Sequence, residues 1–206
     1  MSSIVLTADT LLGTPTIGSV EFDGKAFYNT AQGTQRGIIP GAQFFRLNSD
    51  LAGANVATAQ NVFGVSVTLS TSTVYAFEGI YLFSKIAGAT SHTVGTGFGG
   101  SATLNNIGYS SQGTVSSTNP TTNANFGDLI ATSATATATT AAVSSATAYA
   151  VLKVKGTVSI NGGGTFTPQY ILSAAPGGAY STLAGSYFLI YPIGAAGANT
   201  SVGAWA

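Results

Sequence analysis

Short apolar runs with a two-residue period, separated by turns rich in glycine, proline and asparagine, constrain this chain more than any other feature. Residues 73–83 and 148–160 are the clearest runs, and residues 186–193 form the last one. No stretch shows the apolar period of a helix. About ten such runs follow one another with turn signals every ~8–12 residues, the spacing typical of a sandwich or jelly roll. We therefore predict an all-β fold, an antiparallel β-sandwich or jelly-roll-like knob.

Several runs allow more detailed expectations. Residues 73–83 read as a central strand with a bulge at Gly79. Apolar residues alternate over 62–69, which predicts a half-buried strand. Residues 103–110 and 113–117 are predicted as two strands on either side of a turn. The Asn161-Gly162-Gly163-Gly164 stretch predicts a hairpin turn into residues 165–172.

An Asp23-Gly24 pair near the N-terminus predicts a separate small hairpin. Val20 and Phe22 precede it, and aromatic residues follow it before a second turn at Gly33. Asp-Gly between such runs is a strong short-range hairpin signal. A lone hairpin is marginally stable in water, so its apolar face needs a cover. The rest of the chain or a second copy could provide that cover.

The same segment resembles the "GxxEYDGxxFYxTxxGxxR" element of tailed-phage fibre and virion-surface proteins. In those proteins the element lies at the end of a trimeric shaft, just before a β-rich knob. The resemblance extends over about residues 13 to 110, and Phe22 replaces the first tyrosine of the pattern. It implies a homotrimeric virion protein. The matching residues are Gly18, Glu21, Phe22, Asp23, Gly24, Phe27, Tyr28, Thr30, Gly33 and Arg36.

The domain organisation follows from these segments. We predict that residues 1–40 form an N-terminal attachment arm with a β-hairpin stalk, and that residues 41–206 form the sandwich knob. Residues 1–17 are too short for a core of their own, so they either pair with another subunit or with the particle, or fold back as an edge strand. The expected assembly interface consists of apolar residues of the arm and hairpin: Ile4, Val5, Leu6, Leu11, Leu12, Phe22, Phe27 and Tyr28.

The scarcity of charge favours a protein that lives in an assembly. Charged residues make up 6% of the chain, with six basic and six acidic side chains, whereas globular proteins average ~25%. A net charge of zero promotes association. Nucleic-acid binding needs clustered basic residues, so we expect none. We expect no membrane partner either, because no apolar run approaches the ~20 residues of a spanning helix. The first residues lack the basic start of a secretory signal, which fits use without export.

The sequence offers little for catalysis, metals or cofactors, and we predict none of them. The single histidine, His92, is expected to pack in a strand; a metal shared by three copies on a threefold axis is the alternative. Glu21 and Asp23 are two apart, as a glycosidase pair could be, but Asp23 suits its turn and Glu21 suits an ion pair with Lys25 or Arg36. Glu78 lies among apolar residues, and if buried it needs Arg46 or Lys85 as a partner.

The leading expectation is therefore a non-enzymatic structural component of a tailed-phage virion, assembled in the host cytoplasm. It would be a homotrimeric capsid decoration, cement or head-fibre protein that attaches by its N-terminal arm, with the major capsid protein or the tail as partner. The alternative is a short tail-fibre tip that binds a host surface glycan or receptor through loops such as 105–125. A depolymerase is disfavoured by the sparse carboxylates.

Overall fold

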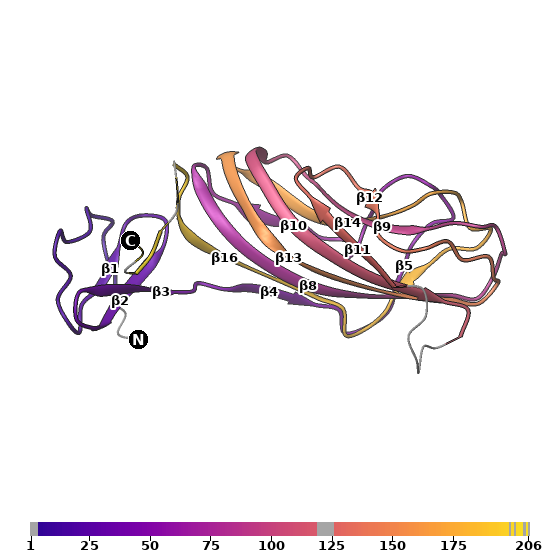
Figure 1. The fold of residues 1–206 in the computed structure, drawn as a ribbon, viewed down its shortest axis with the longest axis horizontal. Helices are drawn as coiled ribbons and strands as arrows, with labels where there is room; N and C mark the ends of the chain where they lie inside the picture. Colours follow the sequence, from indigo (N-terminus) through magenta and orange to yellow (C-terminus); the bar gives the residue numbers. More distant parts are fainter. Residues whose placement is uncertain (1–3, 119–125, 198, 200, 204, 206) are drawn as a thin grey trace.

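The computed structural model describes residues 4–118, 126–197, 199, 201–203 and 205. These residues form sixteen β-strands and no helix, arranged as a small sheet at one end of an elongated sandwich (Figure 1). Every pairing between strands is antiparallel. The predicted all-β antiparallel sandwich is confirmed, and the jelly-roll arrangement stays a prediction. Nowhere in the described ranges is there a helix long and apolar enough to cross a membrane.

The small sheet contains the predicted Asp23-Gly24 hairpin and one more strand. The Asp23 carboxylate accepts hydrogen bonds from the backbone N–H groups of Lys25 and Ala26, both at 2.7 Å, which fixes the turn. Gly24 (φ 84°) and Gly33 (φ 54°) adopt the left-handed conformation that the two turns require. The second turn adds a third strand, so the element is a three-stranded sheet in the order β1 (Val20–Phe22), β2 (Phe27–Gln32), β3 (Gln35–Ile39).

The larger layer of the sandwich is an eight-stranded sheet built on long central strands. Its main path runs β11-β10-β13-β8-β15-β5, and β16 pairs with both β8 and β4. The strands are β4 (Gln43–Arg46), β5 (Leu51–Ala52), β8 (Thr73–Lys85), β10 (Thr103–Ser116), β11 (Phe126–Ala131), β13 (Ala148–Gly162), β15 (Ser181–Thr182) and β16 (Tyr187–Ala195).

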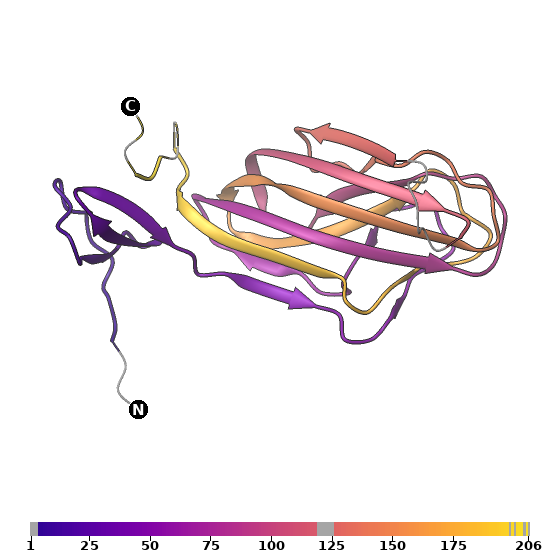
Figure 2. The same cartoon turned by 60° about the horizontal axis from the view of Figure 1, so that its bottom comes forward.

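The second layer is a five-stranded sheet in the order β12-β9-β14-β6, with β7 also paired to β14. Figure 2 shows the two layers of the sandwich, and the small sheet beyond one end of them. The strands of this layer are β6 (Gln60–Asn61), β7 (Val67–Leu69), β9 (Val94–Gly99), β12 (Thr137–Ala138) and β14 (Gly164–Leu172).

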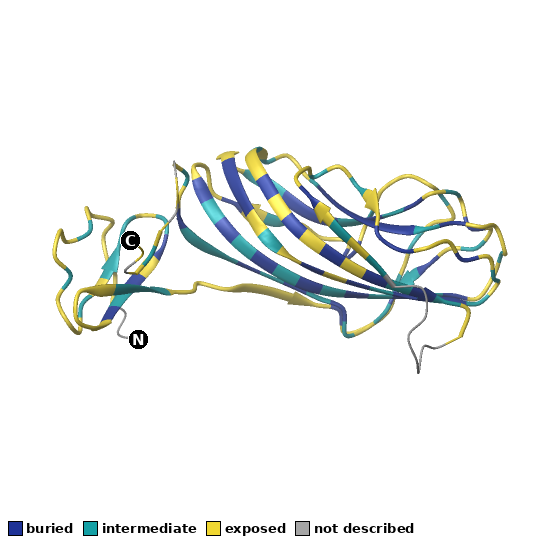
Figure 3. Ribbon diagram, viewed as in Figure 1, coloured by how far each residue is buried: buried dark blue, intermediate teal, exposed yellow. Residues whose placement is uncertain are grey.

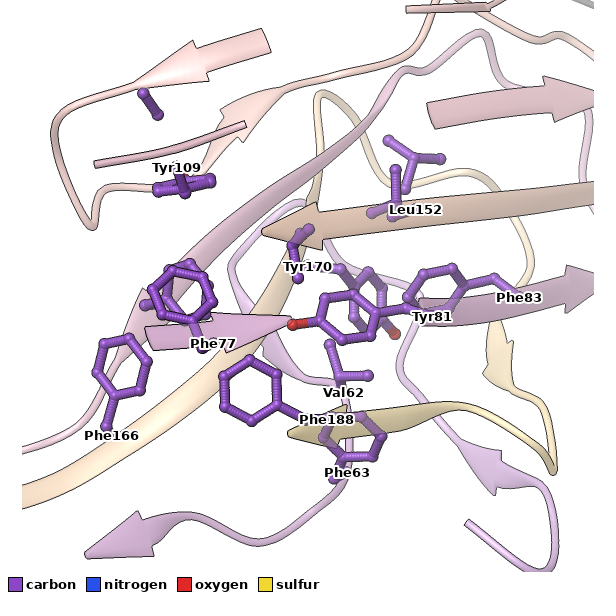
Figure 4. Packing of buried hydrophobic residues seen from close by; sticks show 14 of the residues in the cluster. Val62, Phe63, Phe77, Tyr81, Phe83, Tyr109, Leu152, Phe166, Tyr170 and Phe188 are labelled. Atoms are coloured by element: carbon purple, nitrogen blue, oxygen red, sulfur yellow. The ribbon is translucent and has the colours of Figure 1, made fainter. Parts of the chain in front are cut away.

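Strict alternation places the core between these two layers. Every odd-numbered residue of β8 is buried and every even-numbered one is partly exposed, a pattern visible as stripes in Figure 3. Phe77 is central: its ring lies 5.0 Å from that of Phe98. The rings of Phe188 and Phe166 lie 5.8 Å and 6.0 Å from it (Figure 4). Aromatic rings from both sheets thus fill the space between them, as burial of apolar surface requires.

Two predicted turns are absent, in both cases because of the way β13 is paired. Residues 161–164 do not close a hairpin, because β13 already has β8 and β10 on its two sides and offers no edge to β14. The chain instead passes from one sheet to the other at Gly163. Residues 103–116 form one strand, β10, rather than two, because β13 pairs with β10 over nearly all of its length.

The predicted strand at 62–69 is also wrong, since only Val67–Leu69 is a strand. Val62 and Phe63 are buried but lie in irregular chain. Pro168 supplies the reason. Its carbonyl accepts from the Val62 N–H at 3.0 Å, so its missing N–H falls on that same side of β14. The partner on this side is therefore divided into β6 and β7, which pair with β14 after and before Pro168.

Gly79 does not form the predicted bulge. The register between β8 and β13 runs without interruption from Thr73 opposite Ile160 to Lys85 opposite Ala148. A Cβ atom at Gly79 would instead lie 2.9 Å from the Tyr81 ring and 2.9 Å from the Tyr187 carbonyl oxygen. Close packing of neighbouring strands, and not a change of register, explains glycine here.

Candidate functional site

An ion pair organises the N-terminal module, which we define as residues 4–39. Arg36 Nε lies 2.8 Å from Glu21 Oε2. The same two side chains hold the arm: the Leu12 N–H donates to Glu21 Oε1 at 2.7 Å, and Arg36 Nη2 donates to the Leu12 carbonyl at 2.6 Å. Hydrogen bonding from Arg36 is the main cause that lowers the pKa of Glu21. Of the two partners expected for Glu21, the structure selects Arg36; Lys25 Nζ instead donates to the Thr71 carbonyl, at 3.0 Å.

Some of the residues expected at an assembly interface are exposed to solvent, and the others pack within the N-terminal module. Ile4 and Val5 are 93% and 81% exposed, and Leu6, Leu12 and Phe27 are also exposed. Leu11 and Phe22 are half-buried, and the Phe22 ring stacks on that of Phe27 with centroids 4.4 Å apart. Tyr28 is buried within one chain and donates to Asp23 Oδ2 at 3.0 Å. Burial raises the pKa of Tyr28 to about 12, and this residue supports the hairpin.

The C-terminal tail also reaches the N-terminal module. Ser201, Val202 and Gly203 face Leu11 and Arg36 across a shallow pocket of about 400 Å³. A Cβ atom built at Gly203 would lie 3.6 Å from the Arg36 carbonyl oxygen. No strand pattern marks the tail in the sequence, which is why its position could not be predicted.

Five of the charged side chains gather on the outer face of the eight-stranded sheet, and we call them the charged band: Arg46, Glu78, Asp128, Lys153 and Lys155. Cross-strand register places them in two adjacent rows, because residues directly opposite one another share a face. One row runs Asp128, Gln112, Lys153, Ile80, Tyr187, Arg46, and the other runs Ile130, Ser110, Lys155, Glu78, Leu189, Phe44. Alternation alone could not reveal this band, since it depends on which strands are neighbours.

The charged band shows which side chains lie near Glu78. Lys155 lies directly opposite Glu78 on the neighbouring strand. Glu78 is only half-buried, so the condition under which it would need Arg46 or Lys85 as a partner is not met. Arg46 donates to Asn48 Oδ1 at 2.6 Å, and Lys85 lies on the buried face of β8 with the other odd-numbered residues. A shallow pocket of about 280 Å³ lies at the centre of the band, where Ser110 and Tyr187 complete its wall. This pocket offers charged, amide, hydroxyl and aromatic groups on one surface.

Lys85 is the buried cation of the chain. Its ammonium lies within hydrogen-bond distance of four backbone carbonyls, those of Ala87 and Gly88 beyond β8 and those of Ser145 and Ala146 before β13, and its three N–H groups are shared among them. It also lies 6.0 Å from the centroid of the Tyr180 ring. Burial lowers the pKa of Lys85, while the carbonyls favour its charged form. Lys85 thus ties two loops together at one end of the sandwich.

His92 lies inside the sandwich, next to Tyr180. Its Nδ1 is 2.7 Å from the Thr90 carbonyl, which can only accept, so Nδ1 carries a proton. Its Nε2, 2.9 Å from Tyr180 Oη, then accepts from the phenol in the neutral imidazole. The side chain is 1% exposed, so three copies cannot share a metal through it. The described residues contain no group of three or more metal-ligating side chains.

Acidification will destabilise the fold through His92. Burial, followed by the nearby charge of Lys85, holds the pKa of His92 below its usual 6.5. Below about pH 6.5 the unfolded chain binds a proton that the folded chain rejects, so stability falls as the pH falls. The slope for one group is at most about 1.4 kcal/mol per pH unit. Urea unfolding between pH 8 and pH 5 measures it, and His92→Gln should remove the slope. A slope that persists in His92→Gln would show that another group is responsible.

Comparisons with known proteins give no assignment. No protein-family model matches the chain, and a search of curated proteins finds no match either.

Proposed function

We propose that this chain is a non-enzymatic structural protein of a tailed-phage virion, displayed as a homotrimeric decoration, cement or head-fibre protein. The N-terminal module attaches it to the particle, with the major capsid protein or the tail as partner. The resemblance of residues 18–36 to the phage element carries the proposal. The jelly-roll arrangement belongs to the same proposal.

The structural roles of the matching residues support it. Asp23 and Gly24 make the first turn, Gly33 makes the second, and Glu21 pairs with Arg36 to hold the arm. These residues together form the two turns and the ion pair of one small sheet. That shared structural role explains why they occur together in the sequence. The module also keeps apolar side chains accessible, which suits attachment to another protein.

The carboxylates are poorly placed for a depolymerase, since Glu21 is paired with Arg36 and Asp23 accepts the hydrogen bonds of its turn. Asp128 and Glu78 share the outer face, but they lie on β11 and β8, with β10 and β13 between them. Three strand spacings separate them by roughly 14 Å. Glycosidases that use two carboxyl groups place them ~5–9.5 Å apart. The non-enzymatic proposal is therefore favoured.

The alternative, a tail-fibre tip that binds a host glycan, draws support from the charged band. Lysine, glutamine and serine side chains from the two rows line a shallow pocket with Tyr187 and offer hydrogen bonds and a ring for a sugar face. The predicted binding loop, residues 105–125, is a strand over its first half, because β10 ends at Ser116. Residues 119–125 lie outside the described residues. A glycan would therefore bind on the sheet.

The test uses the purified full-length chain. Light scattering should give the mass of a trimer, and incubation with phage heads that lack this protein should end in saturable binding. Ile17→Asp and Val20→Asp, at exposed positions of the module, should each weaken head binding at least tenfold. Lys153→Ala on the outer face is the matched control and should bind normally. A trimer that ignores heads but binds host cells, and loses that binding in Lys153→Ala, would replace decoration with adhesion.

A further inference from the structure

The sandwich is open along one side. A groove of about 350 Å³ runs from β4 at the edge of one sheet to β7 at the edge of the other, and core side chains of Phe63, Phe188 and Ile190 line it. Phe45 and Val65 form part of its lining and are exposed. None of its lining residues is charged. The exposed apolar surface of the groove thus comes from Phe44, Phe45 and Val65, while the core residues that line it are buried.

The same chain carries an apolar segment near its N-terminus that the described residues leave exposed. Ile4, Val5 and Leu6 are exposed, and no charged residue precedes Asp9. The chain after this segment is held to the small sheet, because the Asp9 N–H donates to the Phe22 carbonyl at 3.0 Å. Figures 1 and 2 both show the arm leaving the small sheet and staying clear of the sandwich. Its own groove is therefore not where this segment lies.

We propose that Ile4–Leu6 of one copy bind in the groove between β4 and β7 of a second copy. An extended segment can add to the free edge of β4, which pairs only with β16 among the described strands. Alternation then directs Ile4 and Leu6 to one side, into the groove, and Val5 to the other. The two surfaces match in having no charge, so neither leaves an ion without water or a partner.

The size of the contact indicates how copies associate. Three apolar side chains cover much less than the ~1,200–2,000 Å² of a stable interface, so one inserted arm is weak alone. Insertion of an arm into the next copy is a head-to-tail contact, and such contacts become stable when they close into a ring. A ring of three is the form consistent with the trimer, and to this extent the inference rests on the proposed function.

Cysteine pairs test this directly, because the natural chain has no cysteine. Leu6→Cys combined with Val65→Cys, treated with a short bis-maleimide, should give covalently linked multimers on a denaturing gel. Neither single variant should do so. Leu6→Cys with Ile130→Cys is the matched control, because Ile130 lies on the outer face of β11 and outside the groove. A cross-link within one chain, seen at monomer mass, would show that the arm occupies the groove of its own chain. Trimers that form without any cross-link would show that the arm does not bind in the groove. Either result overturns the proposal.

A charge in either surface should weaken association. Ile4→Asp and Val65→Lys change exposed side chains, so the fold should survive, while the dissociation constant of the multimer should rise at least tenfold. Unchanged multimers in both variants would contradict the proposal. The outcome is separable from particle binding: cross-linked multimers that ignore phage heads would keep the arm exchange and reject the decoration role.

Discussion

Phe77→Ala will lower the free energy of unfolding by about 3–5 kcal/mol, the usual cost of truncating a buried aromatic side chain. Phe77 is 2% exposed, and its ring faces Phe98, Phe166 and Phe188 from three other strands. Deleting it leaves a void at the point where both sheets meet, so the neighbours lose their contacts as well. The urea concentration at the midpoint of unfolding should fall sharply. Far-UV circular dichroism during urea titration measures it.

Ile130→Ala is the control for this change. Ile130 is also an apolar strand residue of the eight-stranded sheet, but it lies on the outer face and is 84% exposed. Its truncation should alter stability by no more than about 0.5 kcal/mol. A loss in Ile130→Ala comparable to that in Phe77→Ala would mean that the outer face is packed in solution. A small loss in Phe77→Ala would contradict the position of the core.

Lys85→Met should be the second costly change, with a loss of about 2–4 kcal/mol. Methionine fills similar volume but cannot donate, so the carbonyls of Gly88 and Ser145 lose their buried partner. A buried acceptor left without a donor costs ~1–3 kcal/mol, and two loops are affected here. Unfolding in urea at pH 7 measures the loss.

Lys153→Met provides the comparison for Lys85→Met, because Lys153 has the same side chain on the exposed face of β13. It should change stability by less than about 0.5 kcal/mol. Equal effects of the two substitutions would show that the ammonium of Lys85 is not held by the carbonyls.

The sequence predicted the long strands at residues 73–83 and 148–160, but not which strands are neighbours. Alternation around Phe77 and in residues 148–160 depends on local spacing and is read directly from the chain. The crossing at Gly163 depends on β13 already having two partners, and the division opposite Pro168 depends on which side its missing N–H faces. Both are long-range facts, so no local pattern contains them.

The same limit applies to the candidate surfaces. The Asp23-Gly24 turn is local in sequence and could be predicted, whereas for Glu21 the sequence left Lys25 and Arg36 as alternative partners. The charged band joins Arg46 to Asp128 across distant strands, and the carbonyls around Lys85 come from two loops far apart in the chain. Residue type alone could not show that Glu78 and Lys85 lie on opposite faces of β8.

The pairing of β8 with β13 has a consequence for biosynthesis. Thr73 pairs with Ile160, so the edge of β8 that β13 covers has no hydrogen-bonding partner until the ribosome has completed β13. At ~5–20 residues per second, the stretch between Lys85 and Ile160 takes on the order of 4–15 s to emerge. Through this interval a long, nearly uncharged strand is open to other nascent chains, and synthesis speed becomes a determinant of yield.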